Sequence, residues 1–276
     1  MIVAFDHGLS AMKLLAIERD YTRAFYIFRP KDSALDNKIV SIIKNADLFI
    51  AVENTPQEII NMRISKIAKE LDSTAFGALA LAGLDKGIVV SMGTGTAFLV
   101  SDGKTTTHVG GTGVGGGLIE GIARYMNLSV EEFVKFSSYG DSSNVDLQVK
   151  HVYPAGLPTL PPDVTASNLA RLEPKSRPED IAAGVIRLVG EVVGVLSVLI
   201  SKIYPGYPIV LVGGLTLIKG LERIIKDAVS LFSREKIQVI VPPHAHLATI
   251  IGAVLTTVDK SLHVDILRAL KNLNLG

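Results

Sequence analysis

The chain has 276 residues, of which 48% are hydrophobic and 20% are charged, and its formal net charge at pH 7 is +1. This length holds one large domain or two smaller ones, and a charge so close to neutral argues against a general role in binding nucleic acids or membrane surfaces. Cysteine is absent from the sequence, which excludes disulfides, thiolate catalysis and cysteine-bound iron–sulfur clusters.

The start of the chain and its most apolar segment both favour a soluble, cytoplasmic protein with no membrane partner. Met1 leads directly into the strand-like IVAFD without a basic region, so we expect no signal peptide. The segment 181–203 is very apolar, but Arg187 and Glu191 interrupt it, and its longest uncharged run is ten residues. Because a bilayer needs about 20 such residues, we expect a buried helix there.

The first part of the chain predicts a strand-rich unit. Its hydrophobic pattern predicts three strands, a helix, a buried strand and a helical turn, at residues 2–6, 12–18, 22–28, 35–44, 48–52 and 56–62. The polar residues 72–74 are typical of a helix N-cap, so we expect a helix over 75–82 that ends at Gly83. Glu70 then precedes a helix N-terminus, where composition alone favours a solvated glutamate.

A second unit with the same order begins at residue 87. Strands are predicted at 87–92, 97–101 and 104–109, with a GTGT turn at 93–96. Residues 108–121 hold seven glycines in fourteen residues, and apolar residues recur at helical spacing from Leu118 on, so a helix starts inside the last glycines.

A strand, a glycine loop and a helix N-terminus form an arrangement that binds phosphate. Backbone N–H groups converge there, and the helix dipole adds roughly half a positive charge. A packing turn is the alternative interpretation, although such a turn needs only one or two glycines. A P-loop does not fit, because Gly117 is followed by Leu118 and Ile119 in place of Lys and Ser/Thr. A dinucleotide fingerprint does not fit either, because the glycines follow antiparallel strands.

The rest of the chain predicts mostly helices. We expect an acidic turn at Glu131 and Glu132, a capping cluster at 139–143 and a proline-rich connector at 154–162. Helices are predicted at 144–152, 165–172, 177–204, 244–258 and 262–273, and strands at 208–212 and 238–241. The last helix is expected to pack back on the first unit.

The repeated order of strand, turn, strand, strand and helix indicates a duplicated α/β fold. Two such halves that face each other, each with a phosphate-touching hairpin turn, characterise the actin and sugar-kinase superfamily. We therefore predict an actin-like (ribonuclease H-like) duplicated ATPase fold with two lobes around a nucleotide cleft. The N-terminal lobe is placed at residues 1–85 and the C-terminal lobe at residues 86–276.

The chain also resembles the type II pantothenate kinases, members of that superfamily that phosphorylate pantothenate at the first step of coenzyme A synthesis. The segments VSMGTGTAFLV (90–100) and HVGGTGVGGGLIEG (108–121) look like the family's second phosphate hairpin and its long glycine loop. YGDSSNVDLQVKHVYP (139–154) and TASNLARL (165–172) are similar to later segments of the family. The likeness covers residues 65–255 well, the first sixty residues mainly at 6–13, and the last twenty hardly at all.

The resemblance assigns roles to individual residues. Glu70 matches the catalytic glutamate, and Asp6 matches the residue that serves magnesium, directly or through water. The positions that match ATP-binding residues are Asp6, Gly8, Ser10, Lys13, Gly93, Thr94, Gly95, Thr96, Gly115, Gly116, Gly117, Leu118, Ile119, Glu120, Gly213 and Gly214. Ala97 and His108 stand at the family's two contacts to pantothenate.

Three departures from the family bear on the acceptor and on the first loop. Leu9 stands where the family has a glycine, Ala97 replaces a serine, and His108 replaces an arginine. Losing one charge-assisted hydrogen bond to the acceptor costs about 1.5–3 kcal/mol of binding free energy. The sequence thus predicts a nucleotide site like that of the family and an altered acceptor pocket.

The resemblance implies an ATP- and magnesium-dependent kinase of a small hydroxyl-bearing metabolite, pantothenate first among candidates, that acts as a homodimer. One alternative is a kinase of the same fold with another pantothenate-like acceptor, which Ala97 and His108 motivate. A second is a nucleotide-binding regulator that transfers no phosphate, which Leu9 motivates and the retention of Glu70 weighs against.

Overall fold

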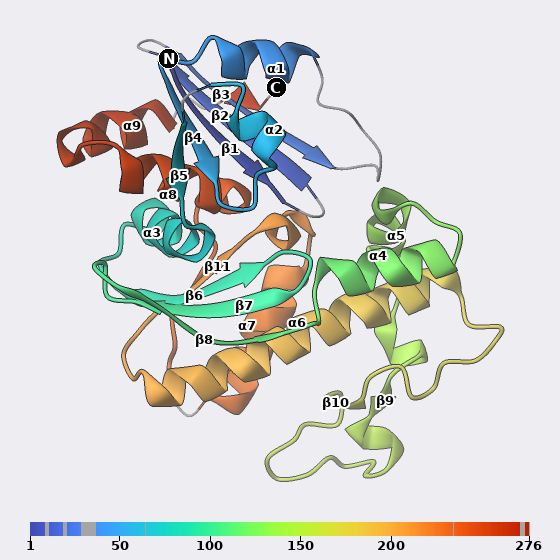
Figure 1. Cartoon of the computed structure of the whole chain (residues 1–276). Coiled ribbons are helices and arrows are strands. Elements are labelled where there is room, and N and C mark those ends of the chain that lie inside the picture. Colours follow the sequence, from blue (N-terminus) through green and yellow to red (C-terminus); the bar gives the residue numbers. More distant parts are fainter. Residues whose placement is uncertain are drawn as a thin grey trace.

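Two mixed β-sheets, with helices between and around them, make up the molecule (Figure 1). The computed structural model describes residues 1–8, 11–18, 21–28, 37–63, 65–233, 235–270 and 274–275. Leu9 and Ser10 therefore lie outside the described residues, as do the first two residues of the helix predicted at 35–44.

The first sheet has the strand order β13-β3-β2-β1-β4-β5. Its antiparallel strands are β1 (Ile2–His7), β2 (Ala11–Glu18) and β3 (Tyr21–Phe28). The strands β4 (Leu48–Val52) and β5 (Ser65–Ala68) run parallel to β1, and β13 (Asn274–Leu275) runs parallel to β3.

Helices cover both faces of this first sheet. Because successive side chains of a strand point to opposite faces, Val3 and Phe5 pack toward α1 (Asn37–Lys44) and α2 (Gln57–Ile60). Ala4, between them, packs instead toward α8 (Ala248–Thr257) and α9 (His263–Leu270).

The second sheet repeats the same plan in the order β12-β11-β6-β7-β8. Its antiparallel strands are β6 (Gly87–Met92), β7 (Thr96–Ser101) and β8 (Thr106–Thr112), and its parallel strands are β11 (Ile209–Val212) and β12 (Val239–Ile240). The predicted strands are confirmed to within one residue at each end, except that β8 begins two residues later and ends three residues later than predicted.

The main core lies between one face of the second sheet and four helices. These are α4 (Gly116–Tyr125), α5 (Val130–Ser137), α6 (Pro178–Ile203) and α7 (Leu221–Phe232), and they bury Val90 and Phe98 of the sheet. The other face of the sheet packs through Val89 and Leu99 against α3 (Glu70–Ala82), which lies between the two sheets (Figure 1).

The start of α3 differs from the sequence prediction. The helix begins at Glu70, five residues earlier than predicted, and the Glu70 backbone N–H donates to the Glu53 carboxylate at 3.0 Å. Ser73 and Thr74, which read as capping residues, are buried where α3 meets α8. Their side chains pack between the two helices, and the N-terminus of α3 is capped by the distant Glu53 instead. The predicted end of the helix at Gly83, in the left-handed conformation, is confirmed.

The predicted acidic turn at Glu131 and Glu132 is wrong, because these residues open α5. The Ser129 hydroxyl accepts from the Glu132 N–H at 3.1 Å, and the Glu132 carboxylate accepts from the Ser129 N–H at 2.8 Å. This reciprocal pair is a capping box, which a serine followed three residues later by glutamate permits.

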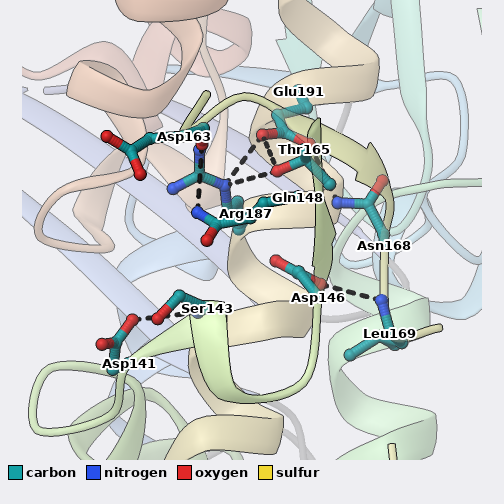
Figure 2. A network of polar contacts seen from close by, with 10 residues as sticks. All are labelled: Asp141, Ser143, Asp146, Gln148, Asp163, Thr165, Asn168, Leu169, Arg187 and Glu191. Carbon is teal, nitrogen blue, oxygen red and sulfur yellow. Dashed lines mark hydrogen bonds and ion pairs between the residues drawn. The ribbon is translucent and has the colours of Figure 1, made fainter. Parts of the chain in front are cut away.

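The helices predicted at 144–152 and 165–172 are also wrong. Short 3₁₀ turns surround the strand β9 (Leu147–Gln148), which pairs with β10 (Thr165–Ser167). The Thr165 hydroxyl and the Asn168 amide donate to the Glu191 carboxylate of α6, at 2.8 and 2.9 Å. Figure 2 shows Thr165 and Glu191 together with Arg187. Polar side chains that bond to neighbouring groups in this way compete with helix formation.

The helix predicted at 177–204 is confirmed as α6, the long helix of the main core. By length and composition this helix could cross a membrane, as many core helices of soluble proteins could. Half of its most apolar stretch is buried inside the protein. At the end of the chain, Ile266 and Leu270 of α9 pack in the core of the first sheet. The division into lobes at residues 85 and 86 stays a prediction.

Candidate active site

A cleft of about 1640 Å³ runs between the two sheets. Its walls come from the adjoining ends of β1 and β2, the β6–β7 turn, the first turns of α3 and α4, and the glycines after β11. Open α/β sheets bind ligands beyond the carboxyl ends of their strands, and β1, β4, β6 and β11 all end here.

Asp6 and Lys13 form an ion pair in the wall from the first sheet. They face each other across β1 and β2, and the Lys13 Nζ lies 2.6 Å from the Asp6 Oδ2. Asp6 is 1% exposed, and both of its carboxylate oxygens have a partner, because the Asn54 amide donates to Oδ1 at 3.0 Å. The geometry places one buried carboxylate and one ammonium group at the end of β1.

Glu70 lies at the first residue of α3, half-buried beside that pair. Asn54 Nδ2 lies 3.4 Å from the Glu70 Oε2 and thus links Glu70 to Asp6. Burial raises the pKa of the Glu70 carboxyl above its ordinary value, and the negative charge of Asp6 acts in the same direction, while Lys13 opposes it. A carboxyl with a raised pKa in a cleft is a candidate proton acceptor.

The β6–β7 turn is docked against the start of α4. The N–H groups of Gly116 and Gly117 donate to the carbonyl oxygens of Gly93 and Thr94, each at 2.8 Å. A Cβ atom added to Gly115 would lie 2.8 Å from the Gly95 backbone, so only glycine fits there. The glycines therefore have a packing function, which was the alternative interpretation of the loop. Their predicted contact with phosphate stays a prediction.

The cleft brings together most of the predicted site residues. The residues that line it are Asp6, Gly8, Lys13, Glu70, Gly93, Thr94, Gly95, Thr96, Ala97, His108, Gly116, Ile119, Glu120, Gly213 and Gly214. Gly115, Gly117 and Leu118 are not among the lining residues. Ser10 lies outside the described residues.

Ala97 and His108 lie on neighbouring strands of the second sheet. Ala97 pairs with Gly111 across β7 and β8, and a register shift follows, so His108 pairs with Leu99. His108 is exposed and contributes to the cleft wall. Two of the three positions at which the chain departs from the kinases it resembles, Ala97 and His108, therefore line the same cleft as Glu70.

Several residues of the site were not singled out from the sequence. Asn54 lines the cleft, and its neighbour Glu53 accepts from the Glu70 N–H. Both directly follow the buried strand β4, and polar residues at the carboxyl end of such a strand are the signal that could have found them. Thr74 and Thr249 carry no comparable signal, because they meet only through the packing of two distant helices. Among the described residues, no group of three or more His, Asp or Glu side chains could hold a metal ion by itself.

Comparisons with known proteins bear on both family and fold. The sequence model named Fumble matches residues 37–256. Type II pantothenate kinases of Staphylococcus aureus, among them those of strains USA300 and NCTC 8325, are 33% identical over 132 residues, which cover 46% of this chain and 49% of theirs. The chain thus spans about half the length of the curated relatives it matches.

Three solved structures share the fold at low sequence identity. The activator of the 2-hydroxyisocaproyl-CoA dehydratase from Clostridium difficile superposes with a TM-score of 0.62 at 14% identity, over 99% of this chain and 98% of that one. The ethanolamine utilization protein EutJ from Carboxydothermus hydrogenoformans gives 0.53 at 18%, over 92% and 88%. The ROK hexokinase from Thermus thermophilus gives 0.52 at 13%, over 92% and 97%. These likenesses confirm the predicted actin-like ATPase and sugar-kinase fold, and they show the fold alone.

Proposed function

This chain belongs to the Fumble family, and we propose that it is a pantothenate kinase that transfers the γ-phosphate of ATP to the primary hydroxyl of pantothenate. The observation that carries the proposal is the raised pKa of Glu70 beside the Asp6–Lys13 pair, in a cleft lined by both glycine turns. Phosphoryl transfer needs an aligned acceptor and charge stabilisation more than covalent chemistry, and this cleft offers groups for both.

In this proposal ATP lies across the cleft with its phosphates between the two hairpin turns. Lys13 and the backbone of residues 93–96 hold the phosphates, and the N-terminus of α4 adds its dipole. Ser10, Gly115, Gly117, Leu118, Ile119 and Glu120 complete the proposed nucleotide site. The adenosine extends toward Gly213 and Gly214, where Leu217, Ile218 and Val134 give the cleft an apolar lining.

Asp6 is the residue proposed to hold Mg²⁺, directly or through water. Mg²⁺ is bound in kinases through one or two carboxylates together with substrate phosphates, and a single buried carboxylate at the end of β1 fits that donor set. When bound, the ion neutralises charge on the phosphates. The Lys13 Nζ, 2.6 Å from the Oδ2, places a positive charge beside the Asp6 carboxylate and orients it in the cleft wall.

Glu70 is the proposed general base. Its carboxylate accepts the proton of the acceptor hydroxyl as that oxygen attacks the phosphorus, and burial, which raises the pKa of Glu70, brings it closer to the range in which proton transfer is efficient. The Asn54 amide and the hydrogen bond from the Glu70 N–H to Glu53 hold the carboxyl near the Asp6 side of the cleft.

The acceptor pocket is proposed to include Ala97 and His108. A different pantothenate-like acceptor stays an alternative because of these two residues, and a regulator without transferase activity stays one because of Leu9. We further propose two lobes, residues 1–85 and 86–276, a cytoplasmic location and a homodimer. A monomeric mass by light scattering at micromolar concentration would refute the dimer.

The test is an assay of the pure protein with ATP, Mg²⁺ and pantothenate, with phosphopantothenate detected by mass spectrometry. Glu70→Gln should lower turnover by about two decades or more, the usual scale for losing a general base, with ADP binding by calorimetry unchanged. Glu58→Gln, on the exposed side of α2, is the matched control and should keep full activity. Unchanged turnover in Glu70→Gln would remove the catalytic assignment, and intact ATP binding without product would favour another acceptor.

A further inference from the structure

Two threonine hydroxyls meet in the floor of the cleft, beside the proposed base. The Thr74 Oγ1 of α3 lies 2.9 Å from the Thr249 Oγ1 of α8. Both residues line the cleft, although their exposed fractions are only 2% and 9%. The pair is therefore a nearly buried polar spot on an otherwise apolar contact between two helices.

The crossing of α3 and α8 fixes the position of this pair. A Cβ atom added to Gly252 would lie 1.7 Å from the Ser73 carbonyl oxygen, and one added to Gly77 would lie 1.9 Å from the Ala248 carbonyl oxygen. The two backbones thus touch directly, with no side chain between them. The hydroxyls on either side of this contact have little freedom to separate.

One of the two hydroxyl protons of the pair has no acceptor within the pair. Each threonine hydroxyl has one proton, and only one of the two protons can lie between the two oxygens. Some helical hydroxyls of this chain donate to a carbonyl of the preceding turn, as Thr256 does to Gly252 and Ser197 does to Val193, whereas the buried Ser73 hydroxyl beside the pair has no partner. Within the described residues, neither Thr74 nor Thr249 makes such a bond. The remaining O–H is left for a group in the cleft.

The pair lies on two helices that border the proposed catalytic groups. Thr74 follows Glu70 by four residues, so the two share one face of α3 about one turn apart, or about 6 Å along the helix axis. Thr249 lies in the first turn of α8, which packs on the first sheet, where β1 carries Asp6. Because both threonines line the same cleft as Glu70 and Asp6, a ligand bound there can bring an oxygen atom to the pair.

We propose that Thr74 and Thr249 together donate a hydrogen bond to an oxygen atom of the bound ligand. That oxygen belongs either to a phosphate of the nucleotide or to a hydroxyl or carbonyl group of the acceptor. The proposal rests on the proposed function in that it takes this cleft to be the kinase site.

The test compares Thr74→Val, Thr249→Val and the double variant with wild type. Valine keeps the shape and removes the hydroxyl. Each single variant leaves one buried hydroxyl without a partner and should unfold at a lower temperature, whereas the double variant, with both partners replaced by apolar groups, should recover much of that stability. Thr256→Val removes a helical hydroxyl of α8 that bonds to its own helix, and it is the matched control.

Ligand binding separates the proposed role from a purely structural one. By calorimetry, the double variant should bind either the ATP analogue ADPNP with Mg²⁺ or pantothenate about 3- to 10-fold more weakly than wild type, the usual scale for one lost neutral hydrogen bond. A loss for ADPNP assigns the oxygen to a phosphate, and a loss for pantothenate assigns it to the acceptor. If the double variant binds both ligands as wild type does, the proposal is overturned. Wild-type protein that binds ADPNP but forms no phosphopantothenate would instead refute the proposed function, and the ADPNP measurement would then decide this proposal.

Discussion

Replacing Gly252 by alanine tests the direct backbone contact between α3 and α8. The new methyl group would lie 1.7 Å from the Ser73 carbonyl oxygen and 2.7 Å from the Gly77 nitrogen, whereas ordinary contacts begin at 3.4 Å. Both partners are helix backbone, which cannot rotate away as a side chain can, so the helices have to move apart. Overpacking of this kind costs about 1–3 kcal/mol and offsets the gain of about 1 kcal/mol that alanine has over glycine inside a helix.

Gly121→Ala is the matched control for this prediction. Gly121 also lies inside a helix, α4, but a Cβ atom there meets nothing within 4 Å. Thermal unfolding should therefore place Gly121→Ala above wild type and Gly252→Ala below it. The two midpoints should differ by about 2–12 °C, since one kcal/mol corresponds to about 2–4 °C in a chain of roughly this size.

The result that would refute this reasoning is a Gly252→Ala protein as stable as Gly121→Ala. It would mean that α3 and α8 have room to separate without loss, and the Thr74–Thr249 pair would then not be held in place by the crossing. If Gly252→Ala unfolds at a lower temperature and also binds ADPNP more weakly than wild type, the contact between α3 and α8 affects ligand binding in the cleft.

Three further predictions concern titration and the polar network on α6. Because folding raises the pKa of Glu70 above its ordinary 4.5, ionisation there opposes folding, so Glu70→Gln should be more stable than wild type at pH 7, and urea midpoints should show this advantage fading as the pH falls from 7 toward 4.5 and absent below 4.5. Burial lowers the pKa of His246 to about 4, so wild type should lose stability as the pH falls from 6.5 toward 4, and His246→Asn should lose less; equal losses would contradict this cause. Glu191 accepts from Thr165 and Asn168 as well as from Arg187, so Glu191→Gln should lower the free energy of unfolding by about 1–3 kcal/mol in urea titrations. Glu222→Gln breaks a similar but exposed pair on α7 and should change it by only about 0.3–0.5 kcal/mol; similar losses in both variants would refute the network argument.

The parts of the fold that could be predicted from sequence are those in which local pattern and burial agree. The strands of both sheets carry runs of apolar residues on at least one face, and most of the turns between the antiparallel strands carry glycine, so the sequence predicts the strand positions and the duplicated order directly. The resemblance to a known family then placed Asp6, Lys13 and Glu70 in one site, and the cleft brings all three together.

The parts that could not be predicted depend on partners far away in the chain. The start of α3 at Glu70 is capped by the Glu53 carboxylate. The segments 144–152 and 165–172 are not helical because their polar groups bond to distant partners. Glu191 accepts from Thr165 and Asn168, and Asp146 accepts from the Leu169 N–H at 2.8 Å (Figure 2). No local window contains these pairs. Helix propensity is a weak preference, and tertiary hydrogen bonds to buried carboxylates override it.

The two halves share a strand order yet offer the cleft different chemistry. Asp6 and Lys13 pair across β1 and β2, whereas the equivalent register positions on β6 and β7 are Ser91 and Ala97. The Asp6–Lys13 ion pair and Glu70 therefore come from the first half, whereas the strand turns of the second half contribute backbone and hydroxyl groups, and its helices add Glu120, Glu131 and Lys135 to the cleft wall. The helix α3 packs on the second sheet and touches α8, which packs on the first sheet. Glu70, the first residue of α3, therefore lies where the two halves of the molecule are in contact.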